Sequence, residues 1–336
     1  MYASPDETLA ALERVGYFTD QKTATTVYLA GRLHRPIMLE GPAGAGKTEL
    51  ATSVSRAYKV PILRLQCYQG INEEKAIGQY DKSLQELYVL LMSKSDHTPD
   101  WTEIKREVTS RAYFMAGPLL EAIEQHQRCV LLIDEIDKVD YAFEAMLLEL
   151  LSAWTLSIPK MGTVQATSIP YVFLTSNQER RLGDPLRRRS FYLVVERPTA
   201  EREAAIVAKR TPDASEKTHC FIAGLAKSLR AYTMEKPPSI SEMNDVALAM
   251  QLLGIEQIRP EHKDIMLPLI AKTEGDRKRL LMKQAFESIV RIAGRYASEM
   301  SPEEATDIEA IFAEKAEEPP DVVVVLKLFA LYTWSS

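Results

Sequence analysis

Residues 41–48 place the strongest constraint on how this chain of 336 residues can fold. They read Gly-Pro-Ala-Gly-Ala-Gly-Lys-Thr and fit the pattern G-x-x-x-x-G-K-S/T, a loop whose backbone N–H groups surround a triphosphate. Glycine lets the backbone bend and approach phosphate oxygens without a Cβ atom in the way. The predicted phosphate-binding residues are Gly41, Pro42, Ala43, Gly44, Ala45, Gly46, Lys47 and Thr48.

The end of the loop and its flanks complete the pattern. Lys47 offers a compact positive charge to the β- and γ-phosphates, and Thr48 offers a hydroxyl to Mg²⁺. The apolar run Ile37–Leu39 precedes the loop, and Glu49–Tyr58 follows it with the apolar spacing of a helix. A helix N-terminus favours anions because it presents free N–H groups and a positive partial charge. This context favours phosphate binding over a purely structural glycine turn.

The bulk composition indicates a soluble protein. The net charge of −6 argues against nucleic acid as the main partner, since that binding requires neutralised phosphates. The three cysteines form no C-x-x-C pair, which suits a reducing compartment. No apolar segment approaches the roughly 20 residues that span a bilayer, and the N-terminus lacks the apolar core of a signal peptide. We therefore expect a cytoplasmic protein without a membrane span.

Short apolar runs alternate with helical patterns through the first two-thirds of the chain. They are rich in Val, Ile and Leu at successive positions, as expected of strands buried on both faces. Strands that alternate with helices form a parallel sheet covered on both sides. We predict an α/β domain over residues 1–199 with a five-stranded parallel sheet between helices. Its strands are expected at Ile37–Leu39, Ile62–Gln66, Val130–Ile133, Tyr171–Thr175 and Phe191–Val195.

Three further regions depart from this alternation. Residues 78–117 form a long insert with expected helices at Leu84–Met92 and Trp101–Tyr113, and residues 156–170 resemble a hairpin with a glycine turn. Residues 200–295 are helical throughout and predict a small second domain. Residues 296–336 hold an acidic helix candidate and an apolar tail of unknown role, either docked on the second domain or used in oligomer contacts.

Two carboxylates follow the apolar run Val130–Ile133. Asp134 is expected to hold the Mg²⁺ shell, and Glu135 to polarise the water that attacks the γ-phosphate. Many strands meet solvent with acidic residues. The position about 90 residues after a phosphate loop, at the carboxyl end of a strand, favours the catalytic role.

Asn177 and an arginine-rich run come after the next predicted strand. Asn177 could bond the attacking water or the γ-phosphate, and its alternative is a turn residue. Residues 180–189 contain five arginines, which suit a nucleic-acid patch, a solvated loop or an arginine finger that reaches a neighbouring subunit. The position between the Asn177 strand and the last strand favours the finger.

These four motifs, in this order, resemble those of AAA+ ATPases, a branch of the P-loop NTPases, and in particular the CoxD-like members of the MoxR class. The resemblance covers roughly residues 10–290 and implies a ring, usually a hexamer, that binds ATP and Mg²⁺ between subunits. It also implies that the helical domain is a lid. The stretches that carry it most closely are Leu39–Gly44, Arg64–Gly70, Leu131–Asp137 and Leu147–Leu151.

The resemblance also implies roles and partners. Asn177 would act as sensor 1, and Arg189, with Arg188, would supply the finger. Lids of this class commonly begin a helix with a sensor-2 arginine, where this chain has Ser241. Members typically pair with a protein bearing a von Willebrand factor A domain and install metal centres or activate enzymes. The CoxD-like members are tied to maturation of the molybdenum–copper site of CO dehydrogenase.

We therefore expect a Mg²⁺-dependent ATP hydrolase that forms a ring and remodels a client enzyme, with metal-centre assembly of a CO-dehydrogenase-type molybdenum enzyme as the implied task. One alternative is an ATP-binding switch that gates a partner without remodelling it. Another is a nucleic-acid-stimulated motor, which the acidic balance disfavours. The first alternative differs from a hydrolase in its steady-state phosphate release.

Overall fold

The computed structural model describes residues 3–93, 100–232 and 234–299. The chain divides into two compact units with their boundary between Arg197 and Pro198. The expected acidic helix and apolar tail beyond residue 300 lie outside the described residues. Among the described helices, none has the length and apolar character that crossing a membrane requires.

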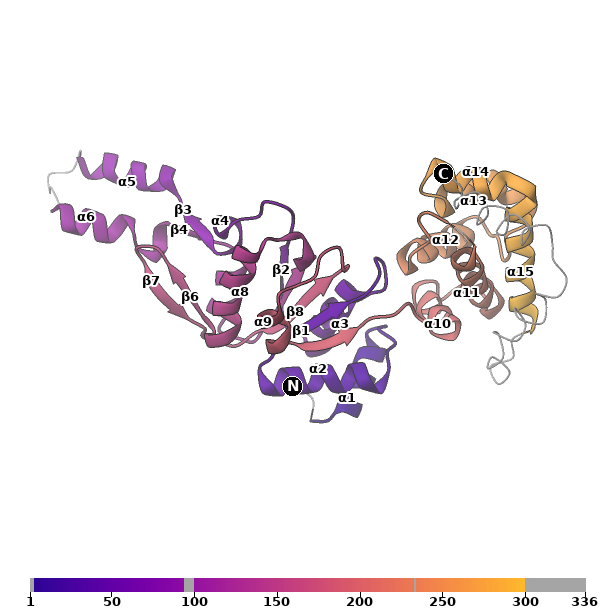
Figure 1. The fold of residues 1–336 in the computed structure, drawn as a ribbon, viewed down its shortest axis with the longest axis horizontal. Coiled ribbons are helices and arrows are strands. Elements are labelled where there is room, and N and C mark those ends of the chain that lie inside the picture. The colour runs from indigo at the N-terminus through magenta and orange to yellow at the C-terminus, as the bar shows by residue number, and fades with distance from the viewer. Residues whose placement is uncertain (1–2, 94–99, 233, 300–336) are drawn as a thin grey trace, which may run out of the picture. The chain divides into compact units, whose positions relative to one another are not determined.

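The first unit contains a five-stranded parallel sheet, which confirms the predicted fold class (Figure 1). The strand order is β2-β5-β8-β1-β9, so the chain crosses over between neighbouring strands. All five carboxyl ends therefore lie at one edge of the sheet, where ligands of such sheets bind. The strands are β1 (Ile37–Glu40), β2 (Ile62–Gln66), β5 (Val130–Asp134), β8 (Tyr171–Ser176) and β9 (Phe191–Val194).

The expectation that every strand is buried on both faces is wrong for the two edge strands. The inner strands β1, β5 and β8 are buried at every position. β2 has only one neighbouring strand, and Ile62, Arg64 and Gln66 are exposed while Leu65 is buried. β9 likewise buries only Leu193. The exposed polar positions of β2 leave Arg64 and Gln66 available to the carboxyl end of β5.

Helices cover both faces of the sheet. On one face, Met38, Leu131 and Leu174 pack with side chains of α7 and α8. On the other, Leu39, Leu132 and Phe173 pack with side chains of α1, α2 and α3. The covering helices are α1 (Pro5–Arg14), α2 (Gln21–Leu33), α3 (Lys47–Tyr58), α7 (Pro118–Glu124) and α8 (Tyr141–Ala153).

The three cysteines are buried and free, and burial raises the pKa of the Cys67 thiol to about 12.

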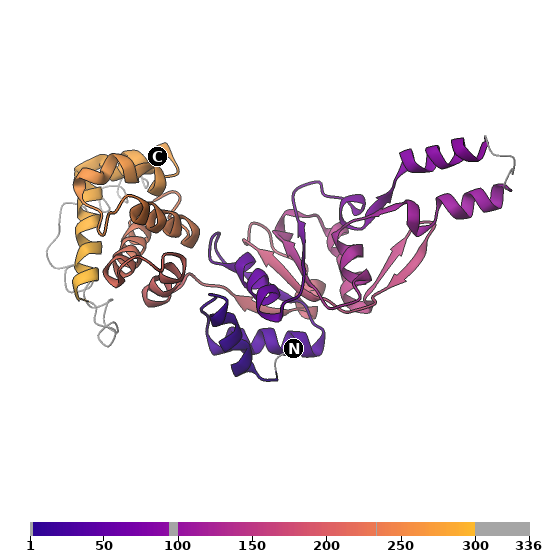
Figure 2. The same ribbon diagram turned by 180° about the vertical axis from the view of Figure 1, so that it is seen from behind.

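Two inserts extend from this unit. Figures 1 and 2 show α5 and α6 side by side beyond the small sheet of β3 and β4, with the hairpin of β6 and β7 nearby. The Tyr80 hydroxyl links the inserts by donating to the carbonyls of Thr109 (2.9 Å) and Pro159 (3.3 Å). α5 has no buried residue. The elements are α4 (Glu73–Ala76), β3 (Gly78–Tyr80), α5 (Lys82–Ser93), α6 (Trp101–Val108), η1 (Arg111–Tyr113), β4 (Phe114–Ala116), β6 (Thr155–Ile158) and β7 (Gly162–Gln165).

The second unit is helical throughout its described residues. Phe221, Met243 and Phe286 are fully buried in its apolar core. A buried ion pair joins Arg230 to Glu203 through two hydrogen bonds. The elements are α10 (Ala200–Arg210), α11 (Glu216–Ala231), α12 (Ile240–Leu252), η3 (Pro260–His262), α13 (Lys263–Ile270), α14 (Glu274–Leu281), η4 (Met282–Gln284) and α15 (Ala285–Glu299).

The arginine-rich run of the first unit is fixed to α8. The buried Glu144 carboxylate accepts the backbone N–H of Gly183 at 2.9 Å and pairs with Arg180. Arg180 also donates to the carbonyl of Val139 at 2.6 Å. These bonds fix the start of the short helix α9 (Asp184–Arg189), which leads into β9.

We expect Glu144→Ala to lower the free energy of unfolding by about 2–3 kcal/mol, because the Gly183 N–H and the Arg180 guanidinium lose a buried carboxylate acceptor. Chemical denaturation of the full chain measures this. Glu149→Ala on the same helix is the matched control, since the exposed Glu149 carboxylate accepts the Ser157 hydroxyl at 2.7 Å in solvent and its loss should change stability by about 1 kcal/mol or less. Equal losses in the two variants would contradict the role of Glu144.

Candidate nucleotide-binding site

The glycine loop connects β1 to α3 and approaches neighbouring backbone closely. A Cβ atom on Gly41 would lie 2.2 Å from the carbonyl oxygen of Val195, so only glycine fits there. Gly46 caps α3 with a φ of 92°, a left-handed conformation that glycine adopts without strain. The loop thus delivers the N-terminus of α3, a helix of 12 residues, to the carboxyl edge of the sheet.

Lys47 lies inside this loop rather than in solvent. Its ammonium group donates to the carbonyls of Gly41 (2.7 Å) and Pro42 (2.9 Å) and to Oδ1 of Asn177 (2.8 Å). The side chain is nearly buried, and burial lowers the pKa of Lys47 while the nearby carboxylates oppose that shift. The loop and the end of β8 therefore hold this cation between them.

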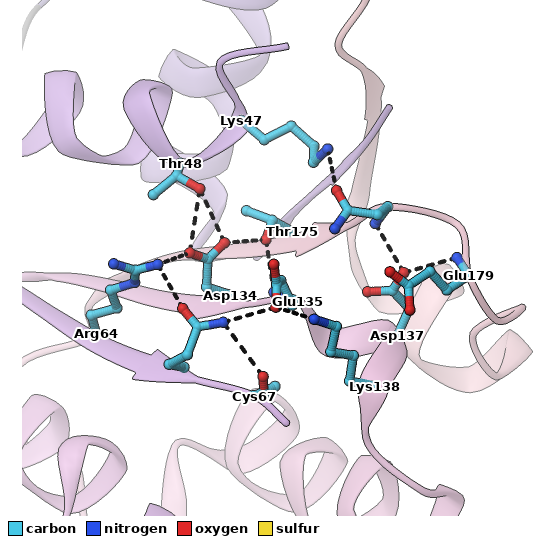
Figure 3. Close-up of polar contacts among 12 residues, drawn as sticks. Lys47, Thr48, Arg64, Cys67, Asp134, Glu135, Asp137, Lys138, Thr175 and Glu179 are labelled. Atoms are coloured by element: carbon cyan, nitrogen blue, oxygen red, sulfur yellow. Dashed lines mark hydrogen bonds and ion pairs between the residues drawn. The ribbon is translucent and has the colours of Figure 1, made fainter. Parts of the chain in front are cut away.

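The buried Asp134 carboxylate connects three segments at the same edge (Figure 3). It accepts the Thr48 hydroxyl at 3.1 and 3.3 Å on its two oxygens, and it also accepts the Thr175 hydroxyl. The guanidinium of Arg64, on β2, forms an ion pair with Oδ2. Asp134 is thus linked to α3, β8 and β2.

Glu135 follows Asp134 in a left-handed conformation with φ of 59° and ψ of 47°. Its backbone N–H donates to the Thr175 hydroxyl at 2.9 Å. Its Oε2 accepts from Lys138 (Figure 3) at a distance of 2.6 Å and from the Gln66 amide at 3.0 Å. Lys138 belongs to the short helix η2 (Ile136–Lys138).

Asp137 fixes the turn that carries Asn177. Its Oδ2 accepts the backbone N–H groups of Asn177 and Glu179, both at 2.9 Å. Asp137 is buried, and within the described part of the chain its Oδ1 has no hydrogen-bond partner. The intervening Gln178 has a φ of 65°, so this turn reverses direction sharply. The turn, held by Asp137, directs the Asn177 amide toward Lys47.

The structure thus brings together five of the residues expected from the sequence to form the site, Lys47, Thr48, Asp134, Glu135 and Asn177. It places Arg188 and Arg189 elsewhere, exposed on α9 and outside the described contacts of this cluster. Their neighbour Arg187 instead pairs at 2.8 Å with the buried Glu40, which also accepts the Tyr192 hydroxyl at 2.7 Å. The bond to Glu40 raises the pKa of Tyr192.

Sequence reasoning missed several polar residues of the site. Arg64 and Gln66 are two residues apart on β2 and therefore lie on the same side of the strand. This spacing of two polar residues in an apolar run could have predicted a polar face on β2. Asp137, Lys138 and Thr175 flank predicted site residues, and the sequence carries no further signal for them. Their roles depend on contacts between segments far apart in the chain.

The residues present fit a Mg²⁺ ion shared with a triphosphate. In proteins Mg²⁺ commonly binds one or two carboxylates together with substrate phosphates, rather than an all-protein cage. Here a hydroxyl (Thr48) and a carboxylate (Asp134) face each other at the first turn of α3. A cluster of three or more His, Cys, Asp or Glu residues suited to a metal does not occur in the described ranges.

Comparison with known proteins finds one matching family and several similar chains. Residues 36–191 match the family described as AAA domain (dynein-related subfamily). Two uncharacterized proteins of Staphylococcus epidermidis are 23% and 22% identical to the chain over 263 residues, covering 76% of the chain and 91% of each relative. Among solved structures, a RuvB mutant of Thermotoga maritima matches with a TM-score of 0.44 and 16% identity, over 85% of this chain and 81% of that one.

The family match covers β1, the glycine loop, β5 and β8 and ends where β9 begins, so it contains the whole site cluster. A glycine loop that leads from a strand into a helix N-terminus, at the carboxyl edge of a parallel sheet, is the arrangement of a phosphate-binding α/β sheet. Residues 36–191 are therefore similar to AAA domains, and the chain is an ATPase with the P-loop NTPase fold.

Proposed function

We propose that the chain is a Mg²⁺-dependent ATP hydrolase that assembles into a ring and remodels a client enzyme. The observation that carries the hydrolase proposal is the convergence of Lys47, Thr48 and Asp134 with Glu135 and Asn177 at one edge of the sheet. Phosphate binding requires only the loop. A carboxylate and an amide positioned beyond the loop serve a reaction at the γ-phosphate.

The loop residues would bind the phosphates of ATP. The free N–H groups at the start of α3 favour an anion, and the ammonium group of Lys47 is held by the loop carbonyls close to them. Thr48 and Asp134 would hold Mg²⁺, which supplies charge neutralisation to the phosphates when it is bound.

Glu135 would orient and deprotonate the attacking water, with Asn177 as the second group that aligns it. The Gln66 amide and the Lys138 ammonium group both donate to Oε2 of Glu135, so we assign Oε1 to the water. Asn177 presents its amide beside Lys47, where the γ-phosphate is expected. Positioning and electrostatic stabilisation supply most of the catalysis of phosphoryl transfer, so the fixed turns at these residues support the assignment.

The arginine run supports a site shared between subunits. Arg180 and Arg187 are anchored to Glu144 and Glu40. Arg188 and Arg189 follow Arg187 on α9 and are exposed, so they are available to a neighbouring copy. A guanidinium supplied from another subunit stabilises the transition state of phosphoryl transfer. The resemblance to the MoxR class supports a closed ring, with six subunits as the proposed number.

The insert helix α5 supports a role in binding other proteins. Five of its apolar side chains are between 42% and 55% exposed, which is more apolar surface than a solvated helix needs. These side chains are Leu84, Leu87, Val89, Leu90 and Leu91. We propose that they contact the client or a von Willebrand factor A domain partner. The proposed task, maturation of a metal-containing enzyme of the CO-dehydrogenase type, rests on the sequence resemblance alone.

Glu135→Gln should bind ATP normally and lose about 100- to 10,000-fold in steady-state phosphate release, because the general base is removed while the loop stays intact. Lys47→Ala should instead lose nucleotide binding. Equilibrium binding of a fluorescent ATP analogue and a phosphate-release assay measure the two effects. Equal release rates for the parent and Glu135→Gln would contradict hydrolysis at this site, and no release by the parent would favour a nucleotide switch.

Arg189→Ala should lower the hydrolysis rate by about a thousandfold or more without loss of nucleotide binding, because the negative charge of the transition state loses the guanidinium that stabilises it. Arg181→Ala is the matched control, since Arg181 belongs to the same run and is highly exposed. Mixing Arg189→Ala with Lys47→Ala chains should restore part of the activity, because one pair of neighbours then has an intact composite site. Absence of rescue in the mixture would argue against a shared site.

Replacing Leu87 and Leu91 together by Gln should leave phosphate release unchanged and abolish client capture, because the two side chains lie one turn apart on α5. The measurement compares proteins captured by Glu135→Gln with ATP, with and without these changes. Leu33→Gln on α2 is the matched control, since Leu33 is 58% exposed outside the insert. Equal capture by all three chains would rule out α5 as the contact surface.

A further inference from the structure

We propose that Arg64 competes with Mg²⁺ for the Asp134 carboxylate. The guanidinium balances this buried charge whenever no divalent cation is bound, and it leaves when one binds. Arg64 is therefore a positioning residue that sets the Mg²⁺ affinity of the site. The proposal rests on the use of Mg²⁺ and nucleotide at this site argued above.

The contact is built into the sheet. Arg64 lies opposite Leu132, and Gln66 lies opposite Asp134, in the parallel pairing of β2 with β5. Asp134 is two residues beyond Leu132 on β5, so it lies on the same face of the sheet as Arg64. The long arginine side chain reaches Oδ2 of Asp134 along the strand. The same guanidinium nitrogen donates to Oε1 of Gln66 at 2.6 Å.

The two partners differ sharply in exposure. The Asp134 side chain is 5% exposed, whereas that of Arg64 is 53% exposed. A nearly buried carboxylate needs hydrogen bonds and a counter-charge, and its other partners, Thr48 and Thr175, are neutral hydroxyls. Arg64 supplies the positive charge. It can also leave, because its side chain lies on an edge strand and is already half in water.

A divalent cation held by Thr48 and Asp134 would take over this charge balance. It would also repel a guanidinium that stays at hydrogen-bonding distance from the same carboxylate. Lys47 does not substitute for Arg64, because its ammonium group is bonded to loop carbonyls and to Asn177. Binding of the metal and departure of Arg64 are therefore linked.

Departure of Arg64 has a consequence for Glu135. Gln66 accepts from Arg64 with its Oε1 and donates with its Nε2 to Glu135. Without Arg64, the Gln66 amide keeps the bonds of its Nε2 to Glu135 and to the Cys67 carbonyl (3.4 Å) but loses the bond that holds its Oε1, so its hold on Oε2 of Glu135 weakens. Arrival of the metal is thereby transmitted to the proposed general base through two side chains of β2.

The test is a titration of the full-length chain with Mg²⁺ in the presence of bound mant-ADP, followed by the fluorescence of the mant group. We expect Arg64→Gln to bind Mg²⁺ about three- to tenfold more tightly than the parent, because the internal competitor is gone. Arg64→Lys keeps the charge without the planar fork, so its affinity should lie between the two.

Arg56→Gln is the matched control, since Arg56 is an exposed arginine of α3 that pairs with Glu49 at 2.9 Å. It removes the same charge away from Asp134 and should leave the Mg²⁺ affinity unchanged. Unchanged or weaker Mg²⁺ binding in Arg64→Gln would overturn the proposal, and so would equal tightening in Arg56→Gln.

If Arg64→Gln does not fold, as judged by circular dichroism, the titration of Arg64→Lys decides in its place. Tighter Mg²⁺ binding than in the parent supports competition, and parental affinity overturns it. Failure of the parent to bind mant-ADP at all would instead refute the proposed function, so the two failures are distinguishable.

Discussion

The Asp134 carboxylate is the interaction on which the arrangement of the candidate site depends. It is buried at the end of a central strand, where an unpaired charge would be severely destabilising. Its partners come from the first turn of α3, from β8 and from β2. Since Ile133 pairs with Leu174, the next residues along β5 and β8 are adjacent, which brings the Thr175 hydroxyl to this carboxylate. One charge thus holds together the segments that would surround a nucleotide.

The residues that follow strands β5 and β8 have strained backbone conformations, and these conformations set the direction of the site side chains. Glu135 and Gln178 both have positive φ values, which cost about 1–3 kcal/mol each for residues other than glycine. Side chains compensate for this cost: Thr175 accepts the N–H of Glu135, and Asp137 accepts the N–H groups on either side of Gln178. The chain therefore turns sharply at the end of each strand, and Glu135 and Asn177 remain at the edge of the sheet.

The sequence could predict those parts of the site that rest on local pattern. The glycine loop, the five apolar runs and the acidic pair at Asp134 and Glu135 are each encoded within a few residues, and the sheet confirms the strands. Strand order was not predictable in this way, because it depends on pairing between distant segments. The expected burial of β2 was wrong for that reason. Its sequence is largely apolar like that of an inner strand, but β2 lies at the edge of the sheet beside one strand only, which leaves part of it exposed.

The polar partners of the site show the same limit. Arg64 and Gln66 stand in an otherwise apolar strand, and their roles become visible only when β2 lies beside β5. Lys138 and Asp137 act through the turns that bring them to Glu135 and to the Asn177 backbone. Arg188 and Arg189 remain a prediction from resemblance, since their proposed target belongs to another copy of the chain.

Charge balance explains why these partners matter to function. Two of the three carboxylates at this edge pair with a cation, Asp134 with Arg64 and Glu135 with Lys138. The third, Asp137, accepts two backbone N–H groups on Oδ2, and its Oδ1 has no hydrogen-bond partner among the described residues. Burial lowers the pKa of Lys47, and the same carboxylates oppose that shift, so the cation and the acidic cluster depend on each other. A nucleotide and a metal ion bound here would bring charges of both signs into this cluster. Binding must therefore exchange ion pairs, and the half-exposed Arg64 is the partner that can exchange with the least disturbance of the core.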